Sequence, residues 1–263
     1  MAKPLPVGQP VKLVEKQPES AAIRELIRKG DVNDKLVVLT AADSLDAENF
    51  RHLRAQIVFP KSGQRQRLLM VTSALPDEGK TYVATNLAVS IALGIHEHVL
   101  LVDADFRRPA IHQIFGYPNA SGLQEHLTGK MQLNDLIIPT KIDKLSILPA
   151  GTEPPNPSEV LSSEIMQETL KELKAHYEDR FIIIDTTPTQ IASEASVLAN
   201  YVDGIILVVM AQKTHRALIQ TSIDSLGRKK ILGMVFNGYE KSYSSRDRYY
   251  KRYYSGYYKH KDK

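Results

Sequence analysis

The residues with the clearest chemical potential lie at 73–81, where the sequence reads Ser-Ala-Leu-Pro-Asp-Glu-Gly-Lys-Thr. This order nearly matches the phosphate-loop pattern G-x-x-x-x-G-K-[ST], with Ala74 in place of the first glycine. In such a loop, backbone N–H groups surround the phosphates, Lys80 supplies a cation and the Thr81 hydroxyl binds Mg²⁺. We therefore predict ATP and Mg²⁺ as cofactors and the following nucleotide-binding residues: Ala74, Pro76, Asp77, Glu78, Gly79, Lys80, Thr81 and Tyr82.

Two further apolar segments end in carboxylates. Val99–Val102 runs into Asp103 and Asp105, and Phe181–Ile184 runs into Asp185. In a parallel sheet these strand ends share one edge with the phosphate loop, which is where ligands bind. Thr81, Asp103 and Asp185 are thus predicted to hold Mg²⁺, whose sites use few carboxylates and keep water and phosphate ligands.

The predicted catalytic residues are Lys80, Asp103 and Asp105. One carboxylate of the Asp-x-Asp pair can bind metal while the other accepts the proton of an attacking hydroxyl. We favour Asp103 as the base, with Asp105 as metal contact or alternate base. Asn237, at the end of the last apolar segment, is a candidate adenine contact or simply a polar end to a strand.

Strands and helices must alternate to bring these residues together. We expect strands at Lys35–Thr40, Arg67–Ser73, His98–Asp103, Leu145–Pro149, Phe181–Asp185, Gly204–Met210 and Ile231–Asn237. We expect a helix capped by Asp43 or Ser44 and running through Ile57. We expect further helices at Ala21–Lys29, Lys80–Leu93, Arg108–Phe115, Gly122–Leu127, Gln132–Ile137, Ser158–Tyr177, Ala192–Asn200 and His215–Leu226. Strands that are apolar on both faces are typical of burial between helix layers. The pattern predicts an α/β fold with a doubly wound, mainly parallel sheet flanked by helices.

Composition divides the 263 residues into three parts. We expect a flexible N-terminal segment over 1–34 with a short helix, a nucleotide-binding domain over 35–238, and a flexible, basic, tyrosine-rich tail over 239–263. The chain has no cysteine, which excludes disulfides, thiolate zinc sites and thiol nucleophiles. No apolar stretch approaches the ~20 residues of a membrane helix, so we predict a cytoplasmic protein.

The tail carries the charge and over half of the tyrosines. From residue 243 onward there are seven Lys/Arg and two Asp/Glu, a net of +5, so the remainder of this +4 chain sums to −1. A mobile tyrosine can enter a neighbouring active site, and each phosphorylation adds about −1.5 to −2 charges. The alternative is a tail that binds RNA or anionic lipid. The predicted phosphoacceptors are Tyr243, Tyr249, Tyr250, Tyr253, Tyr254, Tyr257 and Tyr258.

These motifs together resemble the bacterial tyrosine kinases of capsule and exopolysaccharide synthesis, the BY-kinases. Residues 73–81 resemble that family's Walker A motif, 101–109 its additional Walker motif, and 183–188 its Walker B motif. Residues 148–151 and 154–157 (Leu-Pro-Ala-Gly and Pro-Pro-Asn-Pro) are also similar to the family. The resemblance spans residue 45 to the C-terminus and implies an ATP-dependent tyrosine autokinase that phosphorylates its own tail.

The resemblance also implies partners. Glu48, Arg51 and Arg54 recur every three residues on one helix face, which alone fits a solvated charged face, but they are similar to the family's E-x-x-R-x-x-R oligomerisation motif. The implied partners are other copies of the chain, a membrane-embedded polysaccharide co-polymerase that activates it, and a tyrosine phosphatase. The protein would then lie at the inner membrane through its partner. A nucleic-acid partner is not expected, because the body of the chain is near neutral.

The sequence departs from the family pattern at four positions. Asp77 stands where glycine is frequent, Thr187 where a second proline is common, and Glu194 and Met210 where Asp and Arg are frequent. The MinD/ParA partition ATPases are the alternative, since they resemble the chain in their Walker motifs. They carry a second lysine early in the phosphate loop, where this chain has Leu75, and lack a tyrosine cluster.

Overall fold

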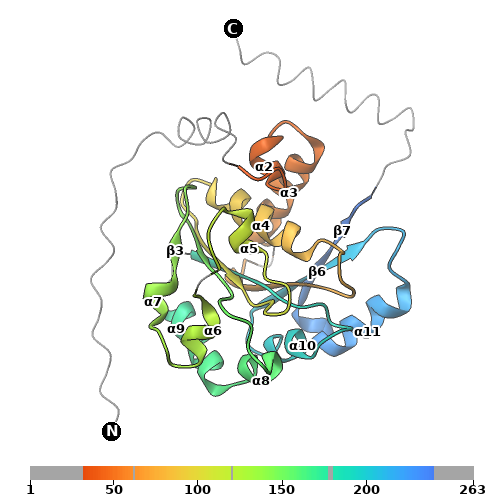
Figure 1. The fold of residues 1–263 in the computed structure, drawn as a ribbon. Helices are drawn as coiled ribbons and strands as arrows, with labels where there is room; N and C mark the ends of the chain where they lie inside the picture. The colour runs from red at the N-terminus through yellow and green to blue at the C-terminus, as the bar shows by residue number, and fades with distance from the viewer. Residues whose placement is uncertain (1–31, 62, 120, 177–179, 240–263) are drawn as a thin grey trace, which may run out of the picture.

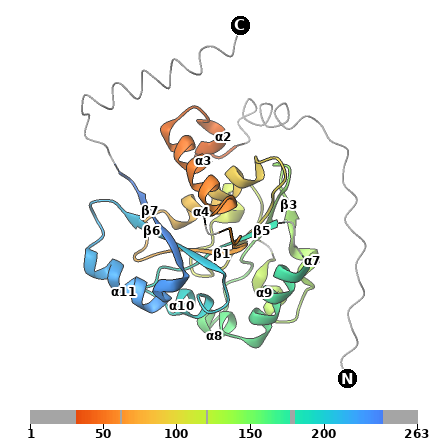
Figure 2. The ribbon, with the colours of Figure 1, turned by 180° about the vertical axis from the view of Figure 1, so that it is seen from behind.

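The computed structural model describes residues 32–61, 63–119, 121–176 and 180–239. In this part of the chain seven strands form one sheet in the order β3-β4-β2-β5-β1-β6-β7. All neighbours are parallel except β3 and β4, and β3 and β7 lie at opposite edges (Figure 2). The strands are β1 (Leu68–Ser73), β2 (His98–Asp103), β3 (Ile138–Pro139), β4 (Leu145–Leu148), β5 (Arg180–Asp185), β6 (Gly204–Met210) and β7 (Ile231–Asn237).

Helices cover both faces of this sheet, as Figure 1 shows. One face carries α2 (Val37–Thr40), α3 (Leu45–Val58), α4 (Lys80–Ala92) and α5 (Ile111–Ile114). The other carries α6 (Leu123–Leu127), α7 (Leu133–Leu136), α8 (Pro157–Leu161), α9 (Glu164–His176), α10 (Glu194–Leu198) and α11 (Arg216–Leu226), and a 3-10 turn, Arg228–Lys230, precedes β7.

The strands are apolar because helices cover both faces of the sheet. Along β1, Leu69 and Val71 belong to the core under α3 and α4, whereas Leu68 and Met70 belong to the core on the opposite face. Side chains alternate across a strand, so a strand buried on both faces must be apolar at successive positions. The predicted fold class is confirmed, and the predicted bounds of β2, β6 and β7 are those observed.

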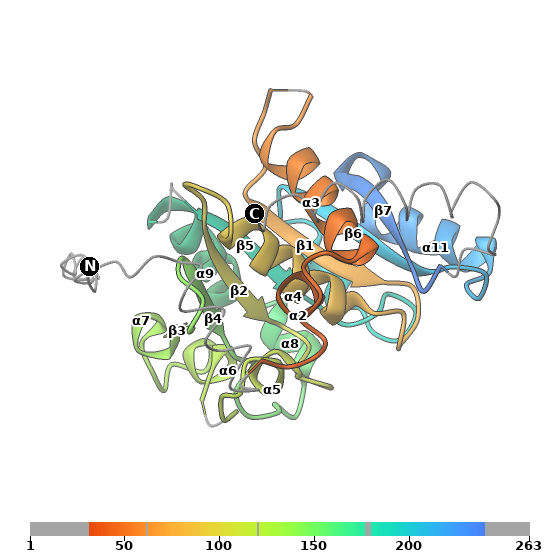
Figure 3. The same ribbon diagram turned by 90° about the horizontal axis from the view of Figure 1, so that it is seen from above.

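The predicted strand at Lys35–Thr40 is wrong, because this segment forms the single helical turn α2. Val38 and Leu39 are buried there, and the turn lies over α4 beside α3 (Figure 3). The Val38 N–H donates to Asn86 Oδ1 at 3.2 Å, and Asn86 Nδ2 donates to the Lys35 carbonyl at 2.8 Å. An apolar run this short fits a strand or a buried helical turn equally well, and packing on α4 selects the turn.

Smaller differences arise from local hydrogen bonds. The predicted helix Ser158–Tyr177 divides into α8 and α9, and Ser162 and Ser163 between them each donate a hydroxyl to a carbonyl of α8. The two-residue strand β3 was not predicted. Of the two candidate caps, Asp43 and Ser44, it is Ser44 that caps α3, since its Oγ accepts the Ala47 N–H at 3.1 Å. The predicted helix Ala21–Lys29 lies outside the described residues.

Within the described ranges, no helix has the length and apolarity required to cross a bilayer.

Candidate active site

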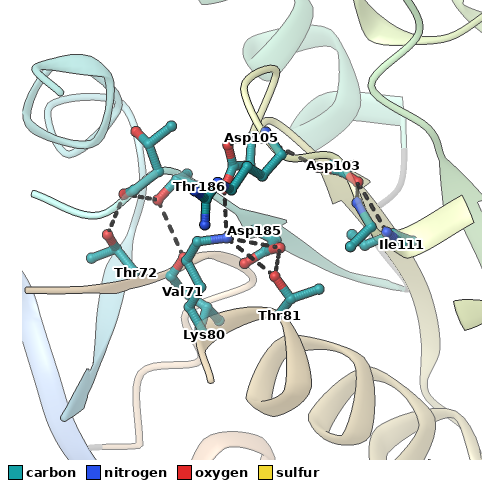
Figure 4. A network of polar contacts seen from close by, with 12 residues as sticks. Val71, Thr72, Lys80, Thr81, Asp103, Asp105, Ile111, Asp185 and Thr186 are labelled. Carbon is teal, nitrogen blue, oxygen red and sulfur yellow. Dashed lines mark hydrogen bonds and ion pairs between the residues drawn. The ribbon is translucent and has the colours of Figure 1, made fainter. Parts of the chain in front are cut away.

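The carboxyl ends of β1, β5 and β2 meet at one edge of the sheet. Asp103 and Asp185 are directly opposite each other in the β2–β5 register. Thr81, in the first turn of α4, donates its hydroxyl to Asp185 Oδ2 at 2.6 Å. Figure 4 shows that Thr81, Asp185, Lys80 and Asp105 converge on one point. Residues separated by a hundred positions in sequence are thus adjacent because β5 lies between β1 and β2.

Lys80 is the central cation of this group. Its Nζ lies 2.6 Å from Asp105 Oδ2 and 3.7 Å from Asp185 Oδ2, and it donates to Thr81 Oγ1 at 3.1 Å. Burial alone lowers the pKa of Lys80, but attraction to Asp185 and Asp105 outweighs burial, so the pKa is raised. Lys80 therefore carries its positive charge at every physiological pH.

Asp103 is fully buried and faces the start of α5 (Figure 4). Its Oδ2 accepts the N–H groups of Ala110 and Ile111 at 3.0 and 3.1 Å, and its Oδ1 accepts the Asp105 N–H at 3.2 Å. Burial, followed by the charge of Asp185, raises the pKa of Asp103 to about 7, and the Ile111 hydrogen bond opposes this rise. A carboxyl with a pKa near neutrality is suited to accept a proton, although here it also fixes the loop that carries Asp105.

The residues present fit a magnesium ion held with phosphate and water. Asp185 Oδ1 is buried and has no hydrogen-bond partner among the described residues, while Oδ2 of the same carboxylate accepts the Thr81 hydroxyl. Burial raises the pKa of Asp185 even though Lys80 opposes this, and a bound cation would offset that cost. No group of three Asp, Glu or His side chains in the described ranges forms a closed metal cage. Mg²⁺ often binds through one or two carboxylates together with substrate phosphates.

The phosphate loop has the backbone conformation that its glycine predicts. Gly79 has φ +89°, and a Cβ there would lie 2.0 Å from Asn237 Nδ2, so another residue would strain the backbone and displace Asn237. Asp77 has φ +60°, a left-handed conformation that favours glycine. Lys80 begins the 13-residue helix α4, whose free N–H groups point at the loop and attract anions.

Two of the predicted nucleotide-binding side chains make other contacts. The buried carboxylate of Glu78 accepts the Leu75 N–H at 2.9 Å, the Met210 N–H at 3.4 Å and the Thr214 hydroxyl. The Tyr82 ring lies against Phe50 of α3, with 5.7 Å between ring centroids. Burial and the nearby Asp46 carboxylate raise the pKa of Tyr82 to about 12. Ala74 and Pro76 lie in the loop, with Ala74 buried.

Asn237, predicted as an adenine contact or a polar strand end, lies beside the phosphate loop. Its Nδ2 donates to the Glu78 carbonyl at 2.9 Å. That contact uses one of its two amide protons and leaves its Oδ1 available.

An ion pair beside the site was missed. Arg107 Nε and Nη2 lie 3.1 and 3.0 Å from Glu194 Oε1, and the Glu194 side chain is fully buried at the start of α10. No sequence pattern links residues 87 positions apart, so this pair required the structure. It joins the loop after β2, which carries Asp105, to the start of α10.

The predicted oligomerisation residues contact their own chain. Arg51 Nε lies 2.6 Å from Glu48 Oε2, and Arg51 Nη1 donates to the Ala42 carbonyl at 3.0 Å. Arg54 Nη1 donates to the Ser90 carbonyl of α4 at 2.9 Å. The intersubunit role of these residues stays a prediction. The seven predicted phosphoacceptor tyrosines lie outside the described residues.

The unusual Asp77 gives a direct prediction. An Asp77→Gly variant should be more stable by about 0.5 to 1 kcal/mol, because glycine adopts positive φ without strain. It should also bind nucleotide about two- to fivefold more tightly, because an exposed carboxylate, whose ion pair with Arg108 is long at 4.0 Å, leaves the phosphate site. Urea unfolding and fluorescent-nucleotide titration measure the two effects.

Asp77→Asn is the matched control, because asparagine tolerates positive φ but carries no charge. It should reproduce the tighter binding without the gain in stability. A glycine variant less stable than the natural protein would contradict the argument from backbone strain.

The fold, the phosphate loop and the clustered carboxylates define a P-loop nucleotide-binding domain, and residues 77–222 match the family model described as AAA domain. Among curated proteins, the chain is 35% identical over 217 residues to the tyrosine-protein kinase YwqD of Bacillus subtilis, covering 82% of this chain and 90% of that protein. It is also 35% identical to the tyrosine-protein kinase etk of Escherichia coli K12, covering 77% of this chain and 28% of that protein. The chain therefore belongs to the family of bacterial tyrosine-protein kinases.

Solved structures agree with this assignment. The kinase domain of the Escherichia coli tyrosine kinase ETK superposes with a TM-score of 0.73 at 32% identity, covering 80% of this chain and 82% of that one. The chimerical protein CapA2B2 gives the same TM-score at 31% identity, covering 80% and 93%. The septum site-determining protein MinD of Pyrococcus horikoshii, complexed with Mg-ADP, is more distant, with a TM-score of 0.56 at 25% identity over 67% of this chain and 72% of that one. The kinase interpretation therefore stands over the partition ATPase.

Proposed function

We propose that this tyrosine kinase uses ATP and Mg²⁺ to phosphorylate the tyrosines of the C-terminal tail of another copy of the chain. The observation that carries the proposal is the convergence of Lys80, Thr81 and Asp185 at the phosphate loop, with Asp103 and Asp105 beside them. Thr81 and Asp185 would hold Mg²⁺, which supplies charge neutralisation to the phosphates when bound.

The reaction needs positioning and charge stabilisation more than covalent chemistry. In it, the tyrosine oxygen forms a bond to the γ-phosphorus, the bond from that phosphorus to the bridging oxygen breaks, and ADP leaves. Lys80 stabilises negative charge that develops on the phosphoryl oxygens. Asp103, with a pKa raised to about 7 by its burial, accepts the phenol proton, and Asp105 is the alternate base.

The proposed partners are suggested by the relatives. Because this chain covers only 28% of the Escherichia coli kinase etk, that protein contains further regions beyond its kinase domain. We propose that a membrane-embedded polysaccharide co-polymerase activates this kinase and recruits it from the cytoplasm to the inner membrane. Ring-like self-association through Glu48, Arg51 and Arg54, reversal by a tyrosine phosphatase, and a role in capsule or exopolysaccharide production complete the proposal.

We further propose that the kinase domain spans 35–238. The N-terminal segment 1–34 and the tail 239–263 would lie outside this domain.

One experiment tests the function. Purified protein is incubated with Mg²⁺-ATP, with and without the cytoplasmic segment of the co-polymerase, and phosphate is mapped by mass spectrometry beside a Lys80→Met variant. Phosphotyrosine at 243–258 is expected in the natural protein alone, because methionine keeps the length of Lys80 but removes the charge that stabilises the transferred group. ATP hydrolysis without phosphotyrosine, even with the activator present, would instead favour a MinD/ParA-like nucleotide switch.

A further inference from the structure

The phosphate loop is held from its outer side by the ends of β6 and β7. The Glu78 side chain reaches Met210, the last residue of β6, and Thr214 in the turn that follows. Asn237, the last residue of β7, donates its side-chain amide to the Glu78 carbonyl at 2.9 Å. Both strands lie on the opposite side of β1 from the carboxylates of the active site.

Glu78 is almost completely buried, with 3% of its surface exposed. Buried carboxylates are costly unless hydrogen bonds satisfy them, and here three donors share the two oxygens. Oε2 accepts the Leu75 N–H from the start of the loop at 2.9 Å, and Oε1 accepts the Met210 N–H and the Thr214 hydroxyl. One side chain therefore closes the loop on itself and joins it to the turn after β6.

This contact surrounds the two left-handed positions of the loop. Asp77 at φ +60° and Gly79 at φ +89° flank Glu78, and such conformations persist only when neighbouring contacts enforce them. Asn237 packs so closely against Gly79 that a Cβ would meet its Nδ2 at 2.0 Å. The loop backbone that would face the phosphates is thus held at Glu78 by both its side chain and its carbonyl.

We propose that Glu78 and Thr214 are positioning residues for the nucleotide. The Glu78 carboxylate, oriented by the Thr214 hydroxyl, fixes the backbone N–H groups of residues 77–79 in the arrangement that receives the phosphates of ATP. This inference rests on the proposed function only in assigning a nucleoside triphosphate to the loop. It needs neither the tail tyrosines nor an activator.

The test is titration of the full chain with a fluorescent ADP analogue and Mg²⁺. In Glu78→Gln the amide nitrogen faces a hydrogen-bond donor, and in Thr214→Val the hydroxyl that donates to Glu78 is lost. Each variant should therefore bind the analogue about tenfold more weakly. This is the effect expected from the loss of one hydrogen bond to a charged group. The double variant should bind little more weakly than either single one, because both changes break the same contact. Amide exchange at Leu75, the donor to Glu78 Oε2, should be faster in Glu78→Gln.

Glu168→Gln is the matched control, because Glu168 is an exposed carboxylate on α9, far from the loop in sequence and in fold. It should bind the analogue as the natural protein does. If Glu78→Gln fails to fold, Thr214→Val still decides, because it removes a single hydroxyl. Affinities within twofold of the natural protein, with or without a lower melting temperature, would overturn the proposal. The affinity for the ADP analogue is measured without phosphotransfer. It therefore tests this proposal even if the kinase proposal fails.

Discussion

An Asp103→Asn variant is expected to lose about 10²- to 10⁴-fold in kcat, which is the range that general-base catalysis contributes. The physical reason is that burial places the pKa of Asp103 near 7, close to the pH at which the enzyme works. The base must be ionised to accept the phenol proton, so activity of the natural enzyme should rise as pH increases through about 7. Asparagine cannot accept that proton, and the variant's remaining activity should lack this rise.

Comparison with Asp105→Asn decides which of the two carboxylates is the general base. Asp105 contacts Lys80 at 2.6 Å, so its loss should alter the position of Lys80 and weaken nucleotide binding. Phosphotransfer to a tail peptide, measured from pH 5.5 to 9 at saturating ATP, separates the two effects. If Asp105→Asn loses the pH-dependent rise while Asp103→Asn retains it, then Asp105 is the base. Asp103 would in that case act only by fixing its loop through Ala110 and Ile111.

The positions of the reacting groups could be predicted because they depend on the sheet. Parallel strands place their carboxyl ends together, so the sequence of β1, β2 and β5 was sufficient to predict that Lys80, Asp103 and Asp185 lie near one another. The order of strands then decided which groups are adjacent. Asp103 and Asp185 are neighbours because β2 pairs with β5, whereas β7 lies at an edge of the sheet, away from both strands.

What could not be predicted depends on packing between distant segments. Glu78 lies within a recognised motif and was predicted to bind the nucleotide, but Thr214, which donates to its side chain, is 136 positions away. Arg107 and Glu194 are likewise joined only by the fold. The segment at 35–40 had the composition of a strand, and its conformation was settled by hydrogen bonds to Asn86. Local sequence patterns were sufficient to predict most helices and strands and the phosphate loop. The contacts that hold the site in place join distant segments and were visible only in the structure.

The crowding of carboxylates has a cost to stability that depends on pH. The folded pKa of Asp103 is about 7 and the model-compound value is 3.8, so the folded protein binds a proton that the unfolded chain releases. The stability contributed by protonated Asp103 is therefore complete below pH 3.8 and is lost as pH rises towards 7. At about 1.4 kcal/mol per pKa unit, the loss is of the order of 4 kcal/mol. Asp185 has the same sign, because its pKa is also raised by burial.

Other groups change stability with pH in the opposite direction. The effect of Asp103 must therefore be measured as the difference between the natural protein and a variant. The pKa values of Glu125 and Asp203 are lowered, as burial is outweighed by hydrogen bonds from Thr152 and Lys174 respectively, and their stability is lost as pH falls. Burial also lowers the pKa of His112. Urea unfolding of the natural protein and of Asp103→Asn in EDTA, at pH 4.5 and pH 8, cancels these shared terms. The natural protein should lose stability relative to the variant as pH rises, because only its Asp103 must ionise beside Asp185. If the difference in free energy of unfolding between the two proteins is the same at both pH values, Asp103 is already ionised in the folded protein at pH 4.5. The repulsion between Asp103 and Asp185 would then not raise its pKa.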